Sequence, residues 1–287
     1  MVFSTDFPLR EKTTILIGGK AKLFFAPRGV GELKSLLPKL ISDYETFFLG
    51  GGSNTIFGDF KGVVVSSENL KGWRVIEEIP KWVRLEILAG TPLRELVKPS
   101  IQNGWCGLET LFGIPRITLG GAIAMNAGAY GLEIGNFVER VFYIDPPTGE
   151  IFEDKPTFGY RSSPFPRRGF VFKATLKLPK CGLDLRRRVR ELNLRRRKSQ
   201  PLNLPTAGST FKNPKGFYAG MLLEEVGLRG FCTERGLCFS KKHANFLVNL
   251  SKKATFGDVL RLIDLAKERV FKSFGILLEE EVKIVSL

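Results

Sequence analysis

Four glycine-rich stretches fall in order along this 287-residue chain, and they constrain its fold more than any other feature. Glycine lets the backbone turn tightly and approach a ligand closely, so that consecutive N–H groups can converge on phosphate oxygens. Several such stretches in one chain predict a nucleotide-type ligand with a long phosphate bridge. The stretches are 50–54 (GGGSN), 113–122 (GIPRITLGGA), 125–131 (MNAGAYG) and 207–214 (AGSTFKNP).

The chain is strongly basic, with 44 Lys and Arg against 29 Asp and Glu, a formal net charge of +15. The segment 186–198 alone holds eight basic residues and one acid. A basic surface attracts anions, including phosphorylated cofactors, acidic small molecules and nucleic acid. This segment lacks the interleaved aromatic residues on which nucleic-acid bases stack. We therefore expect a solvated helix or linker face there and no nucleic-acid partner.

Composition excludes two other classes of protein. No apolar run approaches the roughly 20 residues that a membrane helix needs, and the N-terminus lacks a charged-then-apolar signal pattern. We expect a cytoplasmic monomer without a membrane partner. The four cysteines show no CxxC pair or zinc-type spacing, and there is a single histidine, so we expect no metal site. The thiols are predicted to be reduced and mostly structural.

The first 180 residues are typical of short strands separated by glycine turns. The run 46–49 ends directly in the first glycine stretch, and 82–87 alternates apolar and polar residues, as a half-buried strand does. Thr91 and Pro92 predict a helix start, because threonine caps free N–H groups and proline fits the first helical position. Pro99 is expected to end or kink that helix.

The arginine-rich segment is predicted to mark a boundary, after which the pattern becomes more helical. We expect helices at 218–226, stopped by Gly227, and at 255–274, capped by Thr255. A last strand is expected at 277–285. The predicted apolar stripe of the second helix is Phe256, Val259, Leu260, Ile263 and Ala266.

Each glycine stretch also has a purely structural interpretation. The first could wrap a pyrophosphate while Ser53 and Asn54 donate further hydrogen bonds, or it could be a plain tight turn. It is neither a Walker loop nor a GxGxxG fingerprint. Gly120 and Gly121 could let a flat ligand lie against the backbone, or could serve close packing of a helix on a sheet.

Taken in order over nearly the whole chain, the motifs resemble the UDP-N-acetylenolpyruvoylglucosamine reductase family. Besides the four stretches, the matching segments are 14–21, 107–109, 160–163, 200–202, 227–230, 243–246 and 281–283. The resemblance implies NADPH-dependent reduction of an enolpyruvyl ether to a lactyl ether on a UDP-linked amino sugar, in bacterial peptidoglycan precursor synthesis.

The resemblance also implies an α+β fold. It has a two-subdomain FAD-binding region of the vanillyl-alcohol-oxidase type, at 1–70 and 71–180. A smaller α/β substrate-binding domain would follow at 181–287. FAD would be bound without a covalent link, NADPH would be the co-substrate, and no metal would be required.

Three residues match the family's catalytic positions. Ser209 matches its proton donor, and Arg161 and Glu281 match its other active-site residues. Hydride addition to one alkene carbon pushes negative charge onto its neighbour and the carboxylate, where an arginine can stabilise it. The resulting carbanion is basic enough for a serine hydroxyl to protonate it. Glu281 could hydrogen-bond the acid form of the intermediate, or orient a water or Ser209.

Structural roles for the same residues stay open. Ser209 could cap a turn, Arg161 could form a surface ion pair, and Glu281 could be one of three solvated glutamates. His243, in a Lys-Lys-His-Ala-Asn loop, favours a structural role over catalysis. The residues predicted to bind the cofactor are Gly50, Gly51, Gly52, Ser53, Asn54, Gly113, Ile114, Pro115, Gly120, Gly121, Asn126, Ala127 and Gly128. Those predicted to bind the substrate are Tyr160, Lys212, Asn213, His243 and Asn245.

The chain departs from the family pattern in two places. Residues 116–119 (RITL) stand where the family has a shorter link that contains glycine, so the local phosphate contacts are open, although Arg116 could itself meet a phosphate. The short link from Arg161 to Ser209 resembles the subgroup without an inserted tyrosine-bearing loop. Two other functions are alternatives: a flavin oxidase, which would need no Ser209, and a non-enzymatic basic module that binds RNA or nucleotides.

Overall fold

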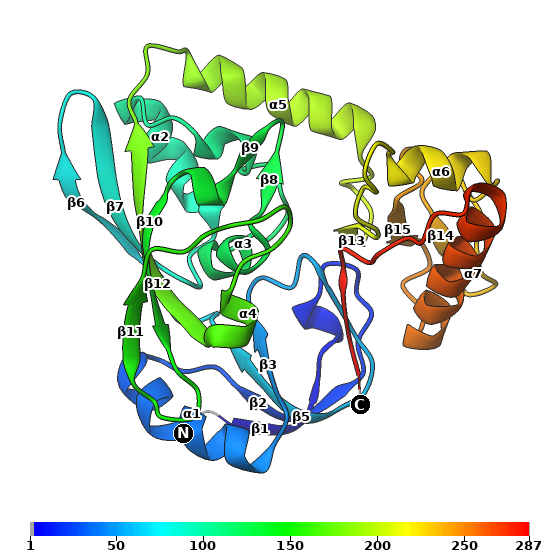
Figure 1. The fold of residues 1–287 in the computed structure, drawn as a ribbon, viewed down its shortest axis with the longest axis horizontal. Helices are drawn as coiled ribbons and strands as arrows, with labels where there is room; N and C mark the ends of the chain where they lie inside the picture. The colour runs from blue at the N-terminus through cyan, green and yellow to red at the C-terminus, as the bar shows by residue number, and fades with distance from the viewer. Residues whose placement is uncertain (1–2, 287) are drawn as a thin grey trace. The chain divides into compact units, whose positions relative to one another are not determined.

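The computed structural model describes residues 3–286, which divide into two compact units (Figure 1). Unit 1 comprises residues 1–6, 22–51 and 61–194, and unit 2 comprises 7–21, 52–60 and 195–287. Helices and strands are mixed, as the α+β prediction requires. The predicted boundaries at 70 and 180 stay a prediction. None of the helices within residues 3–286 has the length and apolar character that a membrane crossing requires.

Unit 1 contains most of a four-stranded sheet and all of an antiparallel five-stranded sheet. The first has the order β1 (Phe3–Pro8), β2 (Lys20–Phe25), β5 (Phe60–Ser66), β3 (Thr46–Leu49). The second has the order β11 (Ile151–Asp154), β10 (Val138–Ile144), β12 (Phe170–Pro179), β7 (Trp82–Leu88), β6 (Trp73–Glu78). A two-stranded hairpin consists of β8 (Gly128–Ala129) and β9 (Leu132–Glu133). The helices are α1 (Val30–Asp43), α2 (Val97–Asn103), α3 (Leu119–Met125) and α4 (Phe165–Arg168).

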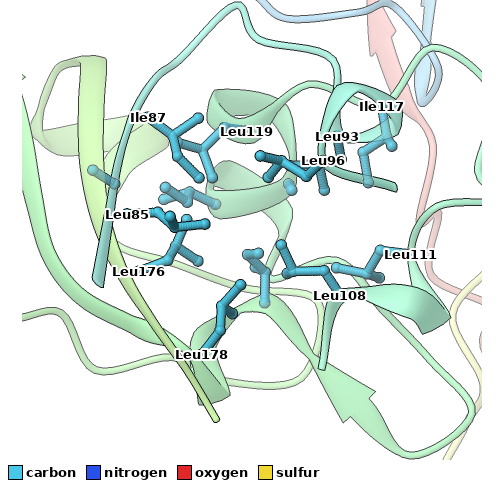
Figure 2. Packing of buried hydrophobic residues seen from close by; sticks show 14 of the residues in the cluster. Leu85, Ile87, Leu93, Leu96, Leu108, Leu111, Ile117, Leu119, Leu176 and Leu178 are labelled. Carbon is cyan, nitrogen blue, oxygen red and sulfur yellow. The ribbon is translucent and has the colours of Figure 1, made fainter. Parts of the chain in front are cut away.

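The alternation predicted at 82–87 is confirmed in β7, where Val83, Leu85 and Ile87 are fully buried. These side chains pack against apolar residues of β12, α3 and the 3₁₀ segments Leu93–Leu96 and Leu108–Thr110 (Figure 2). The sheet therefore has one face on a core that also fixes residues 105–123, which include the second glycine stretch.

Unit 2 is a smaller sheet with two helices. Its strands have the order β13 (Thr206–Ser209), β15 (Phe246–Asn249), β14 (Leu237–Phe239), and the helices are α6 (Ala219–Glu225) and α7 (Phe256–Phe274). A parallel pair joins β4 (Thr55–Phe57) to β16 (Lys283–Val285). The basic segment lies in α5 (Leu185–Ser199), which crosses the division between the units at Leu194. Of the two expectations for 186–198, a helix or a linker, the structure shows the helix.

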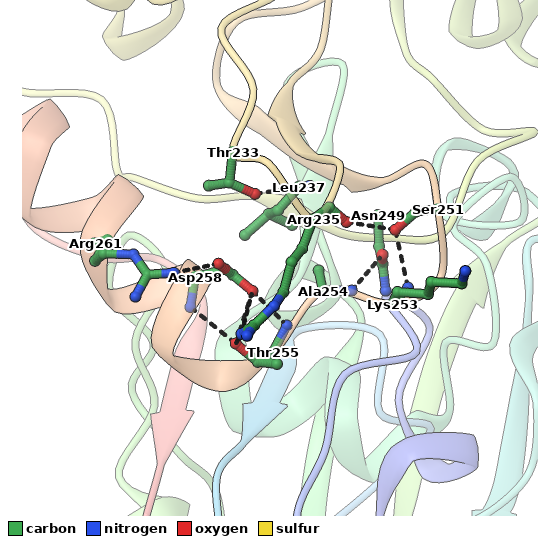
Figure 3. A network of polar contacts seen from close by, with 10 residues as sticks. All are labelled: Thr233, Arg235, Leu237, Asn249, Ser251, Lys253, Ala254, Thr255, Asp258 and Arg261. Carbon is green, nitrogen blue, oxygen red and sulfur yellow. Dashed lines mark hydrogen bonds and ion pairs between the residues drawn. The ribbon is translucent and has the colours of Figure 1, made fainter.

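The ends of α7 are as predicted. Thr255 accepts a hydrogen bond from the Asp258 N–H, while the Asp258 carboxylate accepts one from Thr255 N (Figure 3). Gly275 ends the helix with φ 68°. Burial opposes ionisation of Asp258, but hydrogen bonds from Thr255 and Arg261 outweigh it and hold the pKa of Asp258 below its usual value.

Four details of the predictions are wrong. Leu260 is exposed, and Leu262 takes its place in the α7 stripe, because the helix turns about 100° per residue. Pro99 does not end the helix, since it stands in the first turn of α2, where its missing N–H needs no partner. The last strand is only β16, which begins at Lys283. The fourth concerns the cysteines.

The cysteines are paired, not reduced. Cys106 forms a disulfide with Cys181 in unit 1, and Cys232 forms one with Cys238 in unit 2. The first pair is aligned by the antiparallel bridge between Trp105 and Lys180. The second pair faces across a bridge of its own, with Cα atoms 4.0 Å apart. Backbone pairing, which the spacing of cysteines does not reveal, brings both pairs together.

Candidate functional site

The segments that carry Ser209 and Glu281 lie side by side in unit 2. Ser209 ends β13 opposite Phe246, directly after Gly208, whose φ of 81° interrupts the register of the strand pair. The next residue, Thr210, accepts a hydrogen bond of 2.9 Å from the Glu281 N–H. The side chains of Ser209 and Glu281 are both half-buried. Backbone pairing therefore brings the predicted proton donor and the predicted catalytic carboxylate to one edge of this sheet.

Asn54 connects the end of the first glycine stretch to Glu281. Its Nδ2 donates to the Glu281 carbonyl at 3.0 Å, and its own carbonyl accepts from Lys283 N at 2.9 Å. The parallel pair of β4 and β16 begins immediately after these contacts. Asn54, predicted to bind the cofactor, therefore also joins the glycine stretch to the predicted catalytic residue Glu281.

The predicted substrate residues of unit 2 differ in their exposure and in their hydrogen-bond partners. Lys212 forms an ion pair with Glu279, and Asn213 is exposed but uses Oδ1 to accept the Ala219 N–H at 3.0 Å. Asn245 is 3% exposed, and its amide is bonded to the backbone of Phe211.

His243 is half-buried, and its surroundings favour the neutral form of the ring. Burial lowers its pKa below the ordinary 6.5, and the nearby Glu224 offsets this only in part. Its Nδ1 accepts the Asn245 N–H at 3.3 Å, and its ring lies 4.8 Å from that of Phe246. These contacts are with the protein itself, and substrate binding by His243 stays a prediction.

In unit 1, the predicted catalytic Arg161 is held by one side chain and one backbone carbonyl. Its guanidinium donates to the Gly128 carbonyl at 3.0 Å and lies 3.4 Å from the Glu133 carboxylate. Asn126 donates to the same Glu133 at 2.6 Å. Arg161 has a left-handed backbone with φ 51°, a costly conformation for a non-glycine residue that such contacts must maintain. Sequence reasoning missed Glu133, which binds both predicted residues.

The neighbouring predicted residues differ in exposure. Tyr160 is 52% exposed, and the Arg161 guanidinium lies 5.1 Å from its ring centre. Asn126 is buried, and its amide is engaged with Glu133, the Gly159 carbonyl and the Gly135 N–H. Ala127 and Gly128 lead into the hairpin of β8 and β9. A cofactor contact by this third stretch is thus left to its backbone.

The first and second glycine stretches of unit 1 approach each other closely. A Cβ on Gly51 would stand 1.7 Å from the Arg116 carbonyl oxygen, and one on Gly50 would stand 3.1 Å from the Gly121 Cα. Gly120 is equally confined, with a hypothetical Cβ 2.9 Å from that of Ala89. Gly113, Ile114 and Pro115 lead into this region, where Ile114 N bonds the Leu111 carbonyl. A side chain would clash at Gly51 and at Gly120, and at Gly50 it would crowd the Thr118 hydroxyl and the Gly121 backbone.

Thr118 carries the observation that bears on phosphate binding. Its Oγ1 is buried and has no hydrogen-bond partner among residues 3–286, and it lies 2.9 Å and 3.3 Å from where Cβ atoms would stand on Gly50 and Gly121. A buried hydroxyl without a partner costs about 1–3 kcal/mol. We call the backbone of Gly50, Gly51 and Gly121 the glycine-lined wall. A ligand oxygen beside this wall would supply the missing partner, so these residues fit a pyrophosphate cofactor.

The predicted residues therefore fall into two sets. Unit 2 brings together Ser209, Glu281, Asn54, Lys212, Asn213, His243 and Asn245, and unit 1 contains Arg161, Tyr160 and most of the glycine-rich cofactor residues. Thr118 lies within the 116–119 link that departs from the family pattern, but the sequence does not reveal that its hydroxyl lacks a partner among the described residues.

Two family models match this chain. A family model described as an FAD binding domain matches residues 21–155. A second, described as the C-terminal domain of UDP-N-acetylenolpyruvoylglucosamine reductase, matches residues 200–285.

Individual relatives match along almost the whole chain. UDP-N-acetylenolpyruvoylglucosamine reductase of Aquifex aeolicus (strain VF5) is 43% identical over 99% of this chain and 96% of its own length. The reductase of Clostridioides difficile (strain 630) is 39% identical over 98% of this chain and 92% of its own. The crystal structure of the enzyme from Thermus caldophilus covers 99% of this chain and 98% of its own, with 31% identity and a TM-score of 0.76. The chain belongs to the UDP-N-acetylenolpyruvoylglucosamine reductase family.

Proposed function

We propose that this protein reduces UDP-N-acetylglucosamine enolpyruvate to UDP-N-acetylmuramate, a step of bacterial peptidoglycan precursor synthesis, at the expense of NADPH. Non-covalently bound FAD supplies hydride to the enolpyruvyl alkene. The chain itself must hold the cofactor, bind an anionic sugar nucleotide, stabilise charge on the enolpyruvyl carboxylate and deliver one proton.

Cofactor binding is assigned to the glycine-lined wall. Gly50, Gly51 and Gly121 allow the backbone to approach the pyrophosphate, and Thr118 Oγ1 donates to one of its oxygens. A backbone approach of this kind fixes an anion without requiring a lysine or a metal ion. The unpartnered hydroxyl of Thr118 supports this assignment.

Arg161 stabilises the charge that develops on the substrate carboxylate. A guanidinium can hold a carboxylate with two parallel hydrogen bonds, and its effect is larger when its position is fixed before the reaction. The contacts with Glu133 and Gly128 fix that position. Because the Glu133 carboxylate would repel the carboxylate of the substrate, we assign Glu133 only the role of holding Arg161.

Ser209 donates the proton to the carbon next to the site of hydride addition. The Thr210–Glu281 hydrogen bond of 2.9 Å is the observation that carries this assignment, because it places a carboxylate-bearing segment beside the serine. Glu281 orients the hydroxyl or a water that restores its proton. Lys212, Asn213 and Tyr160 bind the sugar nucleotide, and basic residues of the surface attract its diphosphate.

We further propose that the protein acts as a cytoplasmic monomer and binds no nucleic acid. The arginine-rich helix α5 bears only on nucleic acid. Its basic residues are mostly exposed, but no aromatic residue lies among them for bases to stack on, and Arg187 forms an ion pair with Glu191 on the same helix. Such a helix serves as a solvated surface.

The experiment is a single-turnover comparison of the wild type with Ser209→Ala. We expect NADPH to reduce the bound flavin at the wild-type rate. Product formation should then be slowed about 10²–10⁴-fold, the usual contribution of a general acid. Ser251→Ala, which removes a hydroxyl elsewhere in unit 2, should form product normally. Equal product formation in Ser209→Ala would remove this serine from the mechanism. A colourless protein that does not bind FAD would contradict the function as a whole, and rapid reoxidation by oxygen would favour an oxidase.

A further inference from the structure

Asn245 turns its side chain toward the chain segment that follows Ser209. Its Oδ1 accepts the Phe211 N–H at 2.9 Å, and its Nδ2 donates to the Phe211 carbonyl at 2.8 Å. Its own carbonyl accepts the Thr210 N–H at 2.7 Å. With 3% of its surface exposed, the amide is committed to the protein backbone, which leaves the predicted contact with substrate without support.

These bonds continue the strand pair past the point where it becomes irregular. β13 and β15 pair Thr206 with Val248 and Ser209 with Phe246, but the register shifts between these pairs at Gly208. Beyond Ser209, the Asn245 amide takes the place of a strand, because it bonds the N–H and the carbonyl of the same residue. Thr210 also accepts the Glu281 N–H, from a second neighbouring segment. The segment after Ser209 is therefore held from two directions.

We propose that Asn245 is a positioning residue for proton delivery by Ser209. Without its amide, the segment 210–211 loses both hydrogen bonds to Phe211, although the backbone bonds of Thr210 remain, and the Ser209 hydroxyl moves relative to the carbon that it protonates. A displacement of about 1 Å can cost about 10²-fold in rate. The inference rests on the proposed function, since it requires Ser209 to be the proton donor.

Asn249, at the other end of β15, provides a matched control. It is also fully buried, and its amide donates to the Ile15 carbonyl at 3.1 Å and accepts the Ala254 N–H at 3.4 Å. Its bonds hold other loops of unit 2 and do not contact residues 209–211. Asn249→Ala therefore removes a comparable buried amide but leaves the hydrogen bonds around Ser209 in place.

The test measures both halves of the reaction in Asn245→Ala and Asn249→Ala holoenzymes. For Asn245→Ala we expect NADPH to reduce the bound flavin at the normal rate, while product formation is slowed about 10- to 100-fold. The solvent isotope effect on product formation should be larger, because proton transfer becomes more rate-limiting. Amide hydrogen exchange at Phe211 should accelerate. Asn249→Ala should change product formation by less than about twofold, as a distant site does. Asn245→Asp, which keeps the acceptor for Phe211 N, is the second variant if the alanine variant does not fold, and its product formation should recover as the carboxyl becomes protonated.

A double-variant cycle with Ser209→Ala separates the possible failures. If Asn245 acts through Ser209, Asn245→Ala should slow product formation little further in the Ser209→Ala background. An equal factor in both backgrounds, or equal slowing by Asn249→Ala, would overturn the positioning role while leaving the function intact. Normal product formation by Ser209→Ala alone would instead overturn the proposed function of that serine.

Discussion

The regions around Arg161 and Ser209 are built by different means. In unit 1, Arg161 is held by the side chain of Glu133, which also binds Asn126. In unit 2, Ser209 is carried by a strand end, and the adjoining Thr210 is bonded to the backbone of Glu281. A side-chain network leaves polar partners unsatisfied when one member is removed, whereas a backbone ladder survives a change of side chain. Function and stability should therefore be coupled in the first region and separable in the second.

The largest expected effects test this coupling at Arg161 and at Ser209. Arg161→Leu should lower kcat/KM about 10²–10³-fold, as the loss of a charge-stabilising donor does. It should also lower the free energy of unfolding by about 1–3 kcal/mol, because Glu133 and the Gly128 carbonyl lose a donor. Ser209→Ala should lower activity alone. Steady-state kinetics and urea unfolding measure both quantities, with Arg168→Leu as a control at an exposed ion pair. Equal loss of stability in the Ser209 and Arg161 variants would erase the contrast.

The disulfides extend the comparison to the stability of each unit. The Cys106–Cys181 pair closes a separation of 75 residues and the Cys232–Cys238 pair one of 6. On loop entropy, replacing the first pair by serines should destabilise the protein by about 4 kcal/mol and the second by about 2 kcal/mol. Unfolding by urea measures the difference. Thiol titration of the unfolded, unreduced protein should find no free thiol in either unit, and four thiols would contradict both pairs.

Two buried hydroxyls of unit 1 sharpen the assignment of the glycine-lined wall. Thr118→Val removes an unpartnered polar atom, so it should stabilise the protein without cofactor. The same change should weaken FAD binding about tenfold or more, because it deletes a hydrogen bond to a charged group. Flavin fluorescence titration and thermal unfolding of the apoprotein measure these opposite effects.

Ser100 is the matched control, since its Oγ is likewise buried without a partner within the described chain. Ser100→Ala should raise apoprotein stability in the same way and leave FAD affinity unchanged. If Thr118→Val lowers apoprotein stability, its hydroxyl serves the fold and the phosphate contact is wrong.

Sequence could predict what depends on neighbours along the chain. The cap by Thr255 and Asp258, the stop at Gly275 and the alternation in β7 follow from local patterns, and the structure confirms them. Other features arise only when distant segments meet. They are the disulfide between Cys106 and Cys181, the ion pair of Glu133 with Arg161, and the unpartnered hydroxyl of Thr118. Asn245 shows the limit for the site: its motif predicted a ligand contact, but the fold turns its amide toward Phe211.

The smallest expected effect concerns His243, whose lowered pKa makes the stability of unit 2 dependent on pH. Burial favours the neutral ring, and Nδ1 must stay unprotonated to accept the Asn245 N–H. The folded protein therefore binds this proton less readily than the unfolded chain. Stability should be unaffected by this residue above pH 6.5, its ordinary pKa, and should fall as pH decreases through the lower folded value. Asp258 acts only at still lower pH, since its pKa lies below the ordinary 3.8.

The test is His243→Asn, whose amide oxygen can replace Nδ1 as acceptor. It should flatten the slope of stability against pH below pH 6.5 in urea unfolding experiments. An unchanged slope would mean that the pH dependence comes from other groups, and a wild type that gains stability on acidification below pH 6.5 would show that the folded protein binds this proton more tightly than the unfolded chain does.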